Sequence, residues 1–237
     1  LELYKKRAKY YFPILEYYLK VNDLPEDLKY LAVHESALNS NAKSSADAVG
    51  VWQFMSYTAD DYGLTITPYI DERKNVIQAS LAACKYLKSL HGRFGDWPLA
   101  IASYNGGEGR IEGTMKRQGE STLFGLSLIE ETERYFFKIL ATSILLKKND
   151  SEIREQSKMY RLEPVEIFVE TDLMDIKAIC DQYDIPYKVF YDFNPQFEQH
   201  MIPYGRHTIL IPKNLILAKQ EKQRLYYANN GLQAGSR

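Results

Sequence analysis

Residues 24–36, LPEDLKYLAVHES, predict a helix that ends beside a carboxylate. Pro25 suits the first helical position, and the two acidic residues after it favour the positive end of a helix. The apolar stripe then runs through Leu28 and Leu31, and Glu35 occupies a later position on the same stripe. This helix is therefore expected to carry a carboxylate at the end of its buried face.

The position of Glu35 allows two interpretations. A carboxylate on a buried stripe loses solvation, so its pKa is expected to rise. A glutamate that keeps its proton near neutral pH is what a general acid requires. Alternatively, Glu35 reaches water or pairs with a lysine or arginine, since structural ion pairs also perturb carboxylates. The helix alone does not separate these interpretations.

Composition indicates an ordinary globular protein. The chain has 237 residues, 45% hydrophobic and 26% charged, which is enough for one large domain or a medium domain plus a small one. Its formal net charge of -1 offers no global basic field, so we expect no nucleic-acid partner. The 19 tyrosines suit contact with sugar rings, and they equally suit half-buried packing.

Neither cysteines nor histidines indicate a metal site. Cys84 and Cys180 fall in different predicted domains and have no partner at ligand spacing. We therefore expect no disulfide framework, no metal and no cofactor. No apolar run approaches the length of a membrane span, and the first residues lack the apolar region of a signal peptide. Export or membrane anchoring would require a segment outside this sequence.

The first 148 residues are predicted to form a mainly α-helical domain. A run rich in Asn, Ser, Ala and Asp at 39–49 predicts an irregular loop, and the glycines at 105–109 predict a break. Residues 131–148 are expected to bury a wide face that includes Tyr135, Phe136, Ile139, Leu140, Ile144 and Leu145. The predicted helices are 8–21, bent or interrupted near Pro13, then 24–36, 50–62, 72–91, one beginning at 98, and 131–148.

The pattern changes after residue 148. Residues 149–162 are polar and indicate a linker or a solvated helix end. Residues 163–213 predict a small α+β domain with the order strand, helix, helix, strand. Its first strand alternates at Val165, Ile167 and Val169, and Asp172 is expected to cap the helix that follows. Residues 214–237 are expected to be a polar tail that is disordered from 231.

Four segments of the first domain resemble family 1 lytic transglycosylases, which form glycoside hydrolase family 23. Any one of these motifs would be weak, whereas four in the same order and spacing across residues 8–148 are specific. They are ES at 35–36, GVWQFM at 50–55, AIASYNGG at 100–107 and ETERY at 131–135.

The resemblance implies a goose-lysozyme-like helical fold and cleavage of peptidoglycan glycan strands. The bond cut would lie between N-acetylmuramic acid and N-acetylglucosamine, and the product would carry a 1,6-anhydromuramoyl end. One glutamate, here Glu35, would act first as acid and then as base. No second carboxylate stands out with a matching motif, although most glycosidases use two.

The resemblance also implies substrate-binding roles for six residues. Ser44 would contact the reacting sugar, and Gln53 and Met55 would line the cleft. Tyr104 and Asn105 would match the family's Tyr-Asn pair, in which the tyrosine hydroxyl lies near the catalytic glutamate. Tyr135 would orient that glutamate or the N-acetyl group of the substrate. All of them except Asn105 have an ordinary alternative: a loop or cap serine for Ser44, a surface amide for Gln53, and core packing for Met55 and the two tyrosines.

The second domain resembles a LysM module in degenerate form. The match lies in residues 173–180, 191–195 and 209–212, while the usual Gly-Asp-Thr opening is replaced by Glu170-Thr171-Asp172. Glycan binding and a structural role against the first domain both remain open. The implied partner is peptidoglycan in the periplasm or at the outer membrane, and we expect a monomer. A lysozyme-like hydrolase and a non-catalytic wall-binding scaffold are the alternatives.

Overall fold

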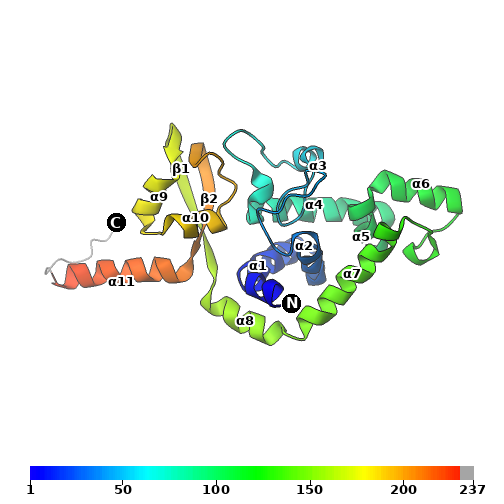
Figure 1. The fold of residues 1–237 in the computed structure, drawn as a ribbon, viewed down its shortest axis with the longest axis horizontal. Helices are drawn as coiled ribbons and strands as arrows, with labels where there is room; N and C mark the ends of the chain where they lie inside the picture. The colour runs from blue at the N-terminus through cyan, green and yellow to red at the C-terminus, as the bar shows by residue number, and fades with distance from the viewer. Residues whose placement is uncertain (230–237) are drawn as a thin grey trace.

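Residues 1–229 are described by the computed structural model, which is mainly helical with one small sheet (Figure 1). Short 3-10 turns lie at Glu26–Leu28 (η1), Glu72–Lys74 (η2) and Leu123–Gly125 (η3). The helices of the first part are α1 (Glu2–Val21), α2 (Lys29–Ser36), α3 (Ser56–Asp61), α4 (Val76–Phe94), α5 (Trp97–Gly106), α6 (Glu108–Gln118), α7 (Glu130–Lys147) and α8 (Asp150–Met159). The second part contains β1 (Leu162–Asp175), α9 (Ile176–Tyr183), α10 (Tyr187–Phe193), β2 (Met201–Pro212) and α11 (Lys213–Asn229).

The main core lies where α1, α2 and α4 meet. Leu28 and Leu31 are buried in it, as the apolar stripe predicted. The Trp52 side chain is fully buried, and its indole nitrogen donates to the Ser80 hydroxyl over 2.9 Å. Burial of these side chains stabilises the packing that carries the end of α2. No helix within residues 1–229 is both long and apolar enough to cross a bilayer.

Two helix predictions near the site were wrong in their bounds. Helix α1 begins at Glu2, six residues before the expected start, and continues through Pro13, where a bend or an interruption was expected and no interruption occurs. Buried Phe12 and Leu15 flank the proline, so core packing offsets the backbone hydrogen bond that Pro13 removes. Residues 50–55 form turns and not the predicted helix, because Gln53 has a φ of 52°. That left-handed conformation cannot continue a right-handed helix.

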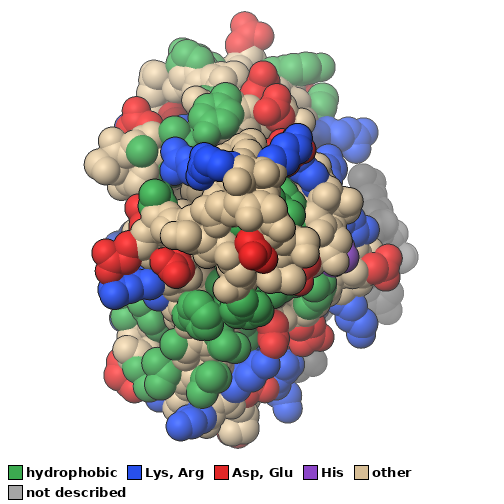
Figure 2. Space-filling model, turned by 90° about the vertical axis from the view of Figure 1, so that its right-hand side faces the viewer, with side chains coloured by type: hydrophobic (Ala, Val, Ile, Leu, Met, Phe, Trp, Pro, Cys, Tyr) green, Lys and Arg blue, Asp and Glu red, His purple; other side chains and the backbone are tan. Residues whose placement is uncertain are grey.

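The buried face of α7 is narrower than the sequence indicated. Its buried residues are Thr132, Tyr135, Ile139, Ser143 and Leu146, whereas Leu140, Ile144 and Leu145 are exposed. Helix α7 packs mainly on α2 and α5, which cover only one side of it. Figure 2 shows hydrophobic side chains gathered in the lower half of the face of the molecule seen there.

The segment expected to be a linker or a solvated helix end contains α8, which packs along α1. Ile153 is buried in the main core. Ion pairs join Lys5 to Glu152 at 2.9 Å and Arg154 to Glu16 at 3.4 Å. A polar helix is stable here because it combines one buried apolar residue with several charge contacts to α1.

The second part has the predicted order of strand, helix, helix and strand. Strands β1 and β2 pair antiparallel, with Ile167 opposite His207. The cap of α9 is Asp175, which accepts a hydrogen bond from the backbone of Lys177, and not the expected Asp172, which lies in β1. The predicted polar tail begins as α11, and the disorder predicted for 231–237 lies outside the described residues.

The second part packs against the first through a loop that precedes η2. The Asp71 amide donates to the Gln196 carbonyl over 2.8 Å, and the Glu198 amide donates to the Tyr69 carbonyl over 2.8 Å. Phe197 is fully buried beside Ile70, and Lys74 pairs with Glu198. The second part therefore has a packing role, and whether it also binds glycans stays an open prediction.

Candidate active site

Glu35 lies one residue before the end of α2. The helix ends there because Ala37 and Leu38 adopt left-handed φ angles of 53° and 58°. The Ser36 hydroxyl donates to the Val51 carbonyl over 2.9 Å. This hydrogen bond ties the end of α2 to the turns at 50–55, so the position of Glu35 is fixed from both sides.

The Glu35 carboxyl is largely desolvated and contacts a tyrosine from α7. The Tyr135 hydroxyl, whose residue is only 3% exposed, donates a hydrogen bond to Glu35 Oε1. Burial raises the pKa of Glu35 to about 7, the Tyr135 hydrogen bond opposes that rise, and the nearby charge of Glu131 adds to it. Glu35 makes no ion pair with any described lysine or arginine. The direction of the pKa shift agrees with the sequence prediction for a buried acid.

A second tyrosine reaches the site from α5. The Tyr104 hydroxyl donates to the Trp52 carbonyl over 2.7 Å, so it fastens α5 to the turns at 50–55. Burial, followed by the charge of Glu35, holds the pKa of Tyr104 well above its ordinary value. The pKa of Tyr135 is raised in the same way. Both phenols therefore remain neutral donors at every pH relevant to Glu35.

Ser44 and Gln53 make hydrogen bonds within their own loop. The Ser44 hydroxyl accepts from the Ala48 amide over 3.0 Å. The Gln53 side-chain nitrogen donates to the carbonyls of Gly50, over 2.8 Å, and Ala42, over 3.2 Å. The ordinary loop-cap role is thus visible for Ser44, and Gln53 holds the loop closed. Neither side chain is hydrogen-bonded to Glu35 in this structure.

The remaining predicted residues lie around this centre. The Asn105 side-chain oxygen accepts from the Thr132 hydroxyl over 3.0 Å, which joins the end of α5 to the start of α7. A Cβ on Gly106 would lie 3.0 Å from the Thr132 methyl group, so these helices approach closely at a glycine. Met55 is half-buried at the start of α3.

A buried ion pair that the sequence did not indicate supports the segment between Asp47 and Phe54. The Arg73 guanidinium pairs with Asp71 at 2.8 Å and donates to the carbonyls of Asp47, over 3.3 Å, and Phe54, over 3.4 Å. Arg73 therefore joins two points of the segment before α3, at Asp47 and at Phe54, to η2. The available signal was the spacing of an acid and an arginine two residues apart in YIDERKN, which by itself is common on surfaces.

The chain matches the Transglycosylase SLT domain family over residues 12–123. It is also 31% identical over 146 residues to an Alteromonas sp. protein assigned to tributyltin chloride resistance, covering 60% of this chain and 70% of that protein. The chain therefore belongs to the SLT transglycosylase-domain family. The family match ends well before β1, so the LysM resemblance stays a prediction.

Within this family, the chain is similar to the membrane-bound lytic murein transglycosylase D of Escherichia coli. The two are 35% identical over 186 residues, which is 73% of this chain and 41% of that protein. The chain thus spans about two fifths of the length of this relative. Among solved structures, the 70 kDa soluble lytic transglycosylase of Escherichia coli matches with a TM-score of 0.52 at 20% identity, over 62% of this chain and 25% of that one. This match shows a common fold.

Proposed function

We propose that the chain is a peptidoglycan lytic transglycosylase that cuts between N-acetylmuramic acid and N-acetylglucosamine and leaves 1,6-anhydromuramoyl ends. The observation that supports this most is the half-buried Glu35 carboxyl, whose pKa is raised to about 7 and which accepts a hydrogen bond from Tyr135. An acid with a pKa near the operating pH serves well both as a proton donor and as a proton acceptor.

In the first step, protonated Glu35 donates its proton to the glycosidic oxygen and the bond from that oxygen to the sugar C1 breaks. Because Tyr135 donates to Oε1, the other carboxyl oxygen of Glu35 is the one free to carry the proton. The carbonyl of the substrate's own N-acetyl group stabilises the positive charge that develops at C1. This substrate assistance accounts for a site without a second catalytic carboxylate.

In the second step, the Glu35 carboxylate takes the proton of the C6 hydroxyl as the C6 oxygen bonds to C1. The glutamate returns to its starting protonation state, and no water is consumed. An intramolecular hydroxyl held close to C1 outcompetes water through its high effective molarity. In this scheme Ser44, Gln53, Met55 and Asn105 bind the glycan, while Tyr104 and Tyr135 position the acid.

Mass spectrometry of the soluble products from purified sacculi tests this proposal. We expect disaccharide peptides that are one water lighter than the corresponding hydrolysis products. Reducing-end products would instead establish a lysozyme-like hydrolase. Binding to sacculi without any soluble product would establish a wall-binding scaffold, and either result would overturn the proposed reaction.

We extend the proposal to the organisation and setting of the protein. Residues 1–148 would form the catalytic domain, and 163–213 would form a LysM-like domain. Helix α8 within 149–162 connects the two. The partner would be peptidoglycan strands in the periplasm or at the outer membrane, and the protein would act as a monomer. The name of the Escherichia coli relative describes it as membrane-bound. Membrane attachment of the present protein would depend on sequence outside residues 1–237.

A further inference from the structure

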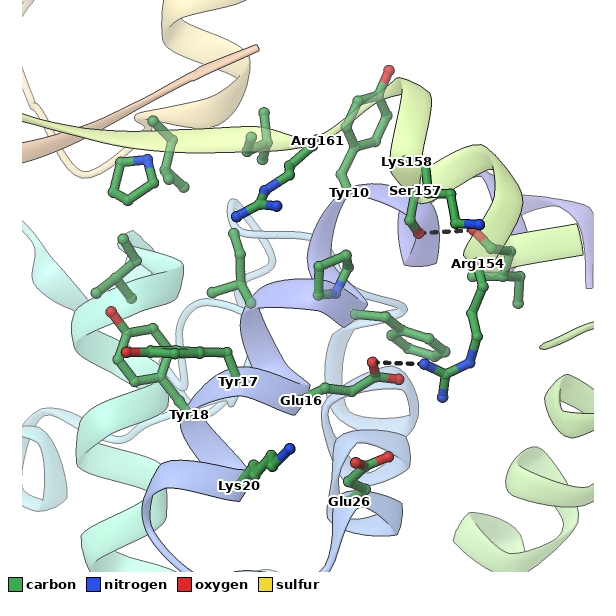
Figure 3. A pocket seen from close by; sticks show the side chains of 18 residues that line it. Tyr10, Glu16, Tyr17, Tyr18, Lys20, Glu26, Arg154, Ser157, Lys158 and Arg161 are labelled. Carbon is green, nitrogen blue, oxygen red and sulfur yellow. Dashed lines mark hydrogen bonds and ion pairs between the residues drawn. The ribbon is translucent and has the colours of Figure 1, made fainter. Parts of the chain in front are cut away.

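A cavity of about 720 Å³ lies between α1, α8 and the beginning of β1 (Figure 3). Its floor is apolar and includes Pro13, Ile14, Ile77, Leu162 and Leu210. None of the candidate active-site residues lines it. The cavity is therefore separate from the site around Glu35, and nothing in the proposed reaction uses it.

Aromatic rings form one wall of this cavity. Tyr17 is 60% exposed, and its ring lies edge-to-face with Tyr18 at a centroid distance of 5.1 Å. Figure 3 shows these two side chains together on one side of the hollow, with Arg161 reaching toward it from the opposite side. Exposed tyrosines present flat apolar faces with a polar edge, which is the surface that the C–H faces of a sugar ring contact.

The rim carries more cations than carboxylates. Lys20, Arg154, Lys158 and Arg161 line the cavity, against Glu16 and Glu26. Glu16 is already paired with Lys29 and Arg154. By contrast, Lys20 and Lys158 make no ion pair with any described residue. Arg161 pairs through its Nε with Glu163 at 3.2 Å, but its side chain is 59% exposed, so its other guanidinium nitrogens can still donate. These groups can bind an additional carboxylate, for which an arginine offers paired donors.

The open face of the β1–β2 hairpin continues from this cavity. Pro164 lines the cavity, and Phe168 lies on the same face of β1 four residues further along. Phe168 is 52% exposed and contacts Tyr204, which is 62% exposed, at a ring distance of 5.7 Å. Arg206 lies opposite Phe168 on β2. The hairpin thus repeats the combination of exposed aromatic rings and a cation, about 13 Å along the strand.

We propose that the cavity is a second binding site, which takes a peptidoglycan glycopeptide with its sugar rings on Tyr17 and Tyr18 and a stem-peptide carboxylate on Arg161 and Lys158. This inference rests on the proposed function for its substrate class. A fragment bound here keeps the strand attached while another part of it reaches Glu35, which raises the local substrate concentration.

The test uses the full chain carrying Glu35→Gln, so that no cleavage occurs, and purified disaccharide tetrapeptide as the probe. Amide NMR shifts are expected to change around α1, α8 and the start of β1 during the titration. In calorimetry, Lys158→Glu combined with Arg161→Glu is expected to weaken binding about tenfold. Tyr17→Ala should weaken it as well, whereas Tyr17→Phe should retain it because the ring is kept.

Lys188→Glu is the matched control, because Lys188 is also an exposed lysine on a helix but lies on α10 away from the cavity. Its affinity for the probe should equal that of the parent. Chitotetraose is a sugar without carboxylates, so of the cavity variants only Tyr17→Ala should bind it more weakly than the parent does. Unchanged affinity in all cavity variants, or shifts confined to residues around Glu35, would overturn the proposal.

The outcomes also separate this proposal from the proposed reaction. Normal release of anhydro products by the cavity variants, together with unaltered binding, would remove the second site and leave the enzyme. Binding that depends on the cavity, in a chain that releases no product from sacculi, would remove the enzyme and leave a binding site for this glycopeptide.

Discussion

Glu35→Gln is expected to reduce the release of soluble muropeptides from purified sacculi by about a thousandfold or more. The amide keeps the size and shape of the side chain, and it still accepts the hydrogen bond from Tyr135, but it cannot donate and reclaim a proton. General acid–base catalysis contributes about 10²–10⁴ in rate, and here a single group would supply both halves. The measurement is the rate of product release at equal protein and sacculus concentrations.

Glu131→Gln is the matched control for this substitution. Glu131 is an exposed carboxylate near Glu35 whose charge raises the pKa of Glu35. Removal of its charge should lower that pKa and retain most of the activity. If Glu35→Gln released product at the parent rate, or if Glu131→Gln were equally inactive, Glu35 would not be the proton donor.

The free energy of unfolding of the Glu35→Gln variant is expected to depend less on pH than that of the parent. The folded pKa of Glu35 is about 7 against an ordinary value of 4.5, so between these values the folded state binds more protons than the unfolded state. The stability of the parent therefore falls as pH rises through this window. Glu35→Gln should match the parent near pH 4.5 and be more stable by about 1–3 kcal/mol at pH 8, as measured by urea unfolding.

Gly50→Ala is expected to lower the free energy of unfolding by about 2–5 kcal/mol. Gly50 has a φ of 86°, and a Cβ there would lie 1.8 Å from the backbone oxygen of Arg73. Backbone must therefore move, and the loop that holds Gln53 must shift with it. Thermal or urea unfolding measures the loss, and activity on sacculi should fall in parallel.

Gly63→Ala separates the clash from the backbone strain. Gly63 also has a positive φ, of 80°, but nothing lies within 4 Å of a Cβ built on it. Its substitution should cost only the strain of the left-handed conformation, about 1 kcal/mol. Equal stability losses in the two variants would show that close packing of Gly50 on Arg73 is not what positions the loop.

The sequence predicted the part of the site that depends on local pattern. The stripe through Leu28 and Leu31 placed Glu35 at a buried helix end, and the glycines after Asn105 marked the break between α5 and α6. The positions and ends of helices can be predicted in this way because apolar periodicity and helix-end residues act over only a few helical turns. The contact of Tyr135 with Glu35 joins residues 100 positions apart, and only the resemblance to a family indicated it.

Other features depend on tertiary packing that local pattern does not contain. The left-handed φ of Gln53 is stable because Arg73 and the Gly50 carbonyl hold the loop, so the helical pattern at 50–62 misled the prediction. Leu140 and Ile144 were expected to be buried, but α2 and α5 cover only the other side of α7. The cavity behind α1 exists only because α8 packs there.

NMR titration of the Glu35 carboxyl group in the folded protein determines whether Glu35 can be the proton donor. We expect a midpoint near pH 7 for its carboxyl carbon resonance, because burial disfavours the charged form more than Tyr135 favours it. Tyr135→Phe should move the midpoint higher still, since the hydrogen bond to the carboxylate is lost. A midpoint near 4.5 in the parent protein would exclude Glu35 as the general acid, because it would then be ionised and unable to donate a proton at neutral pH.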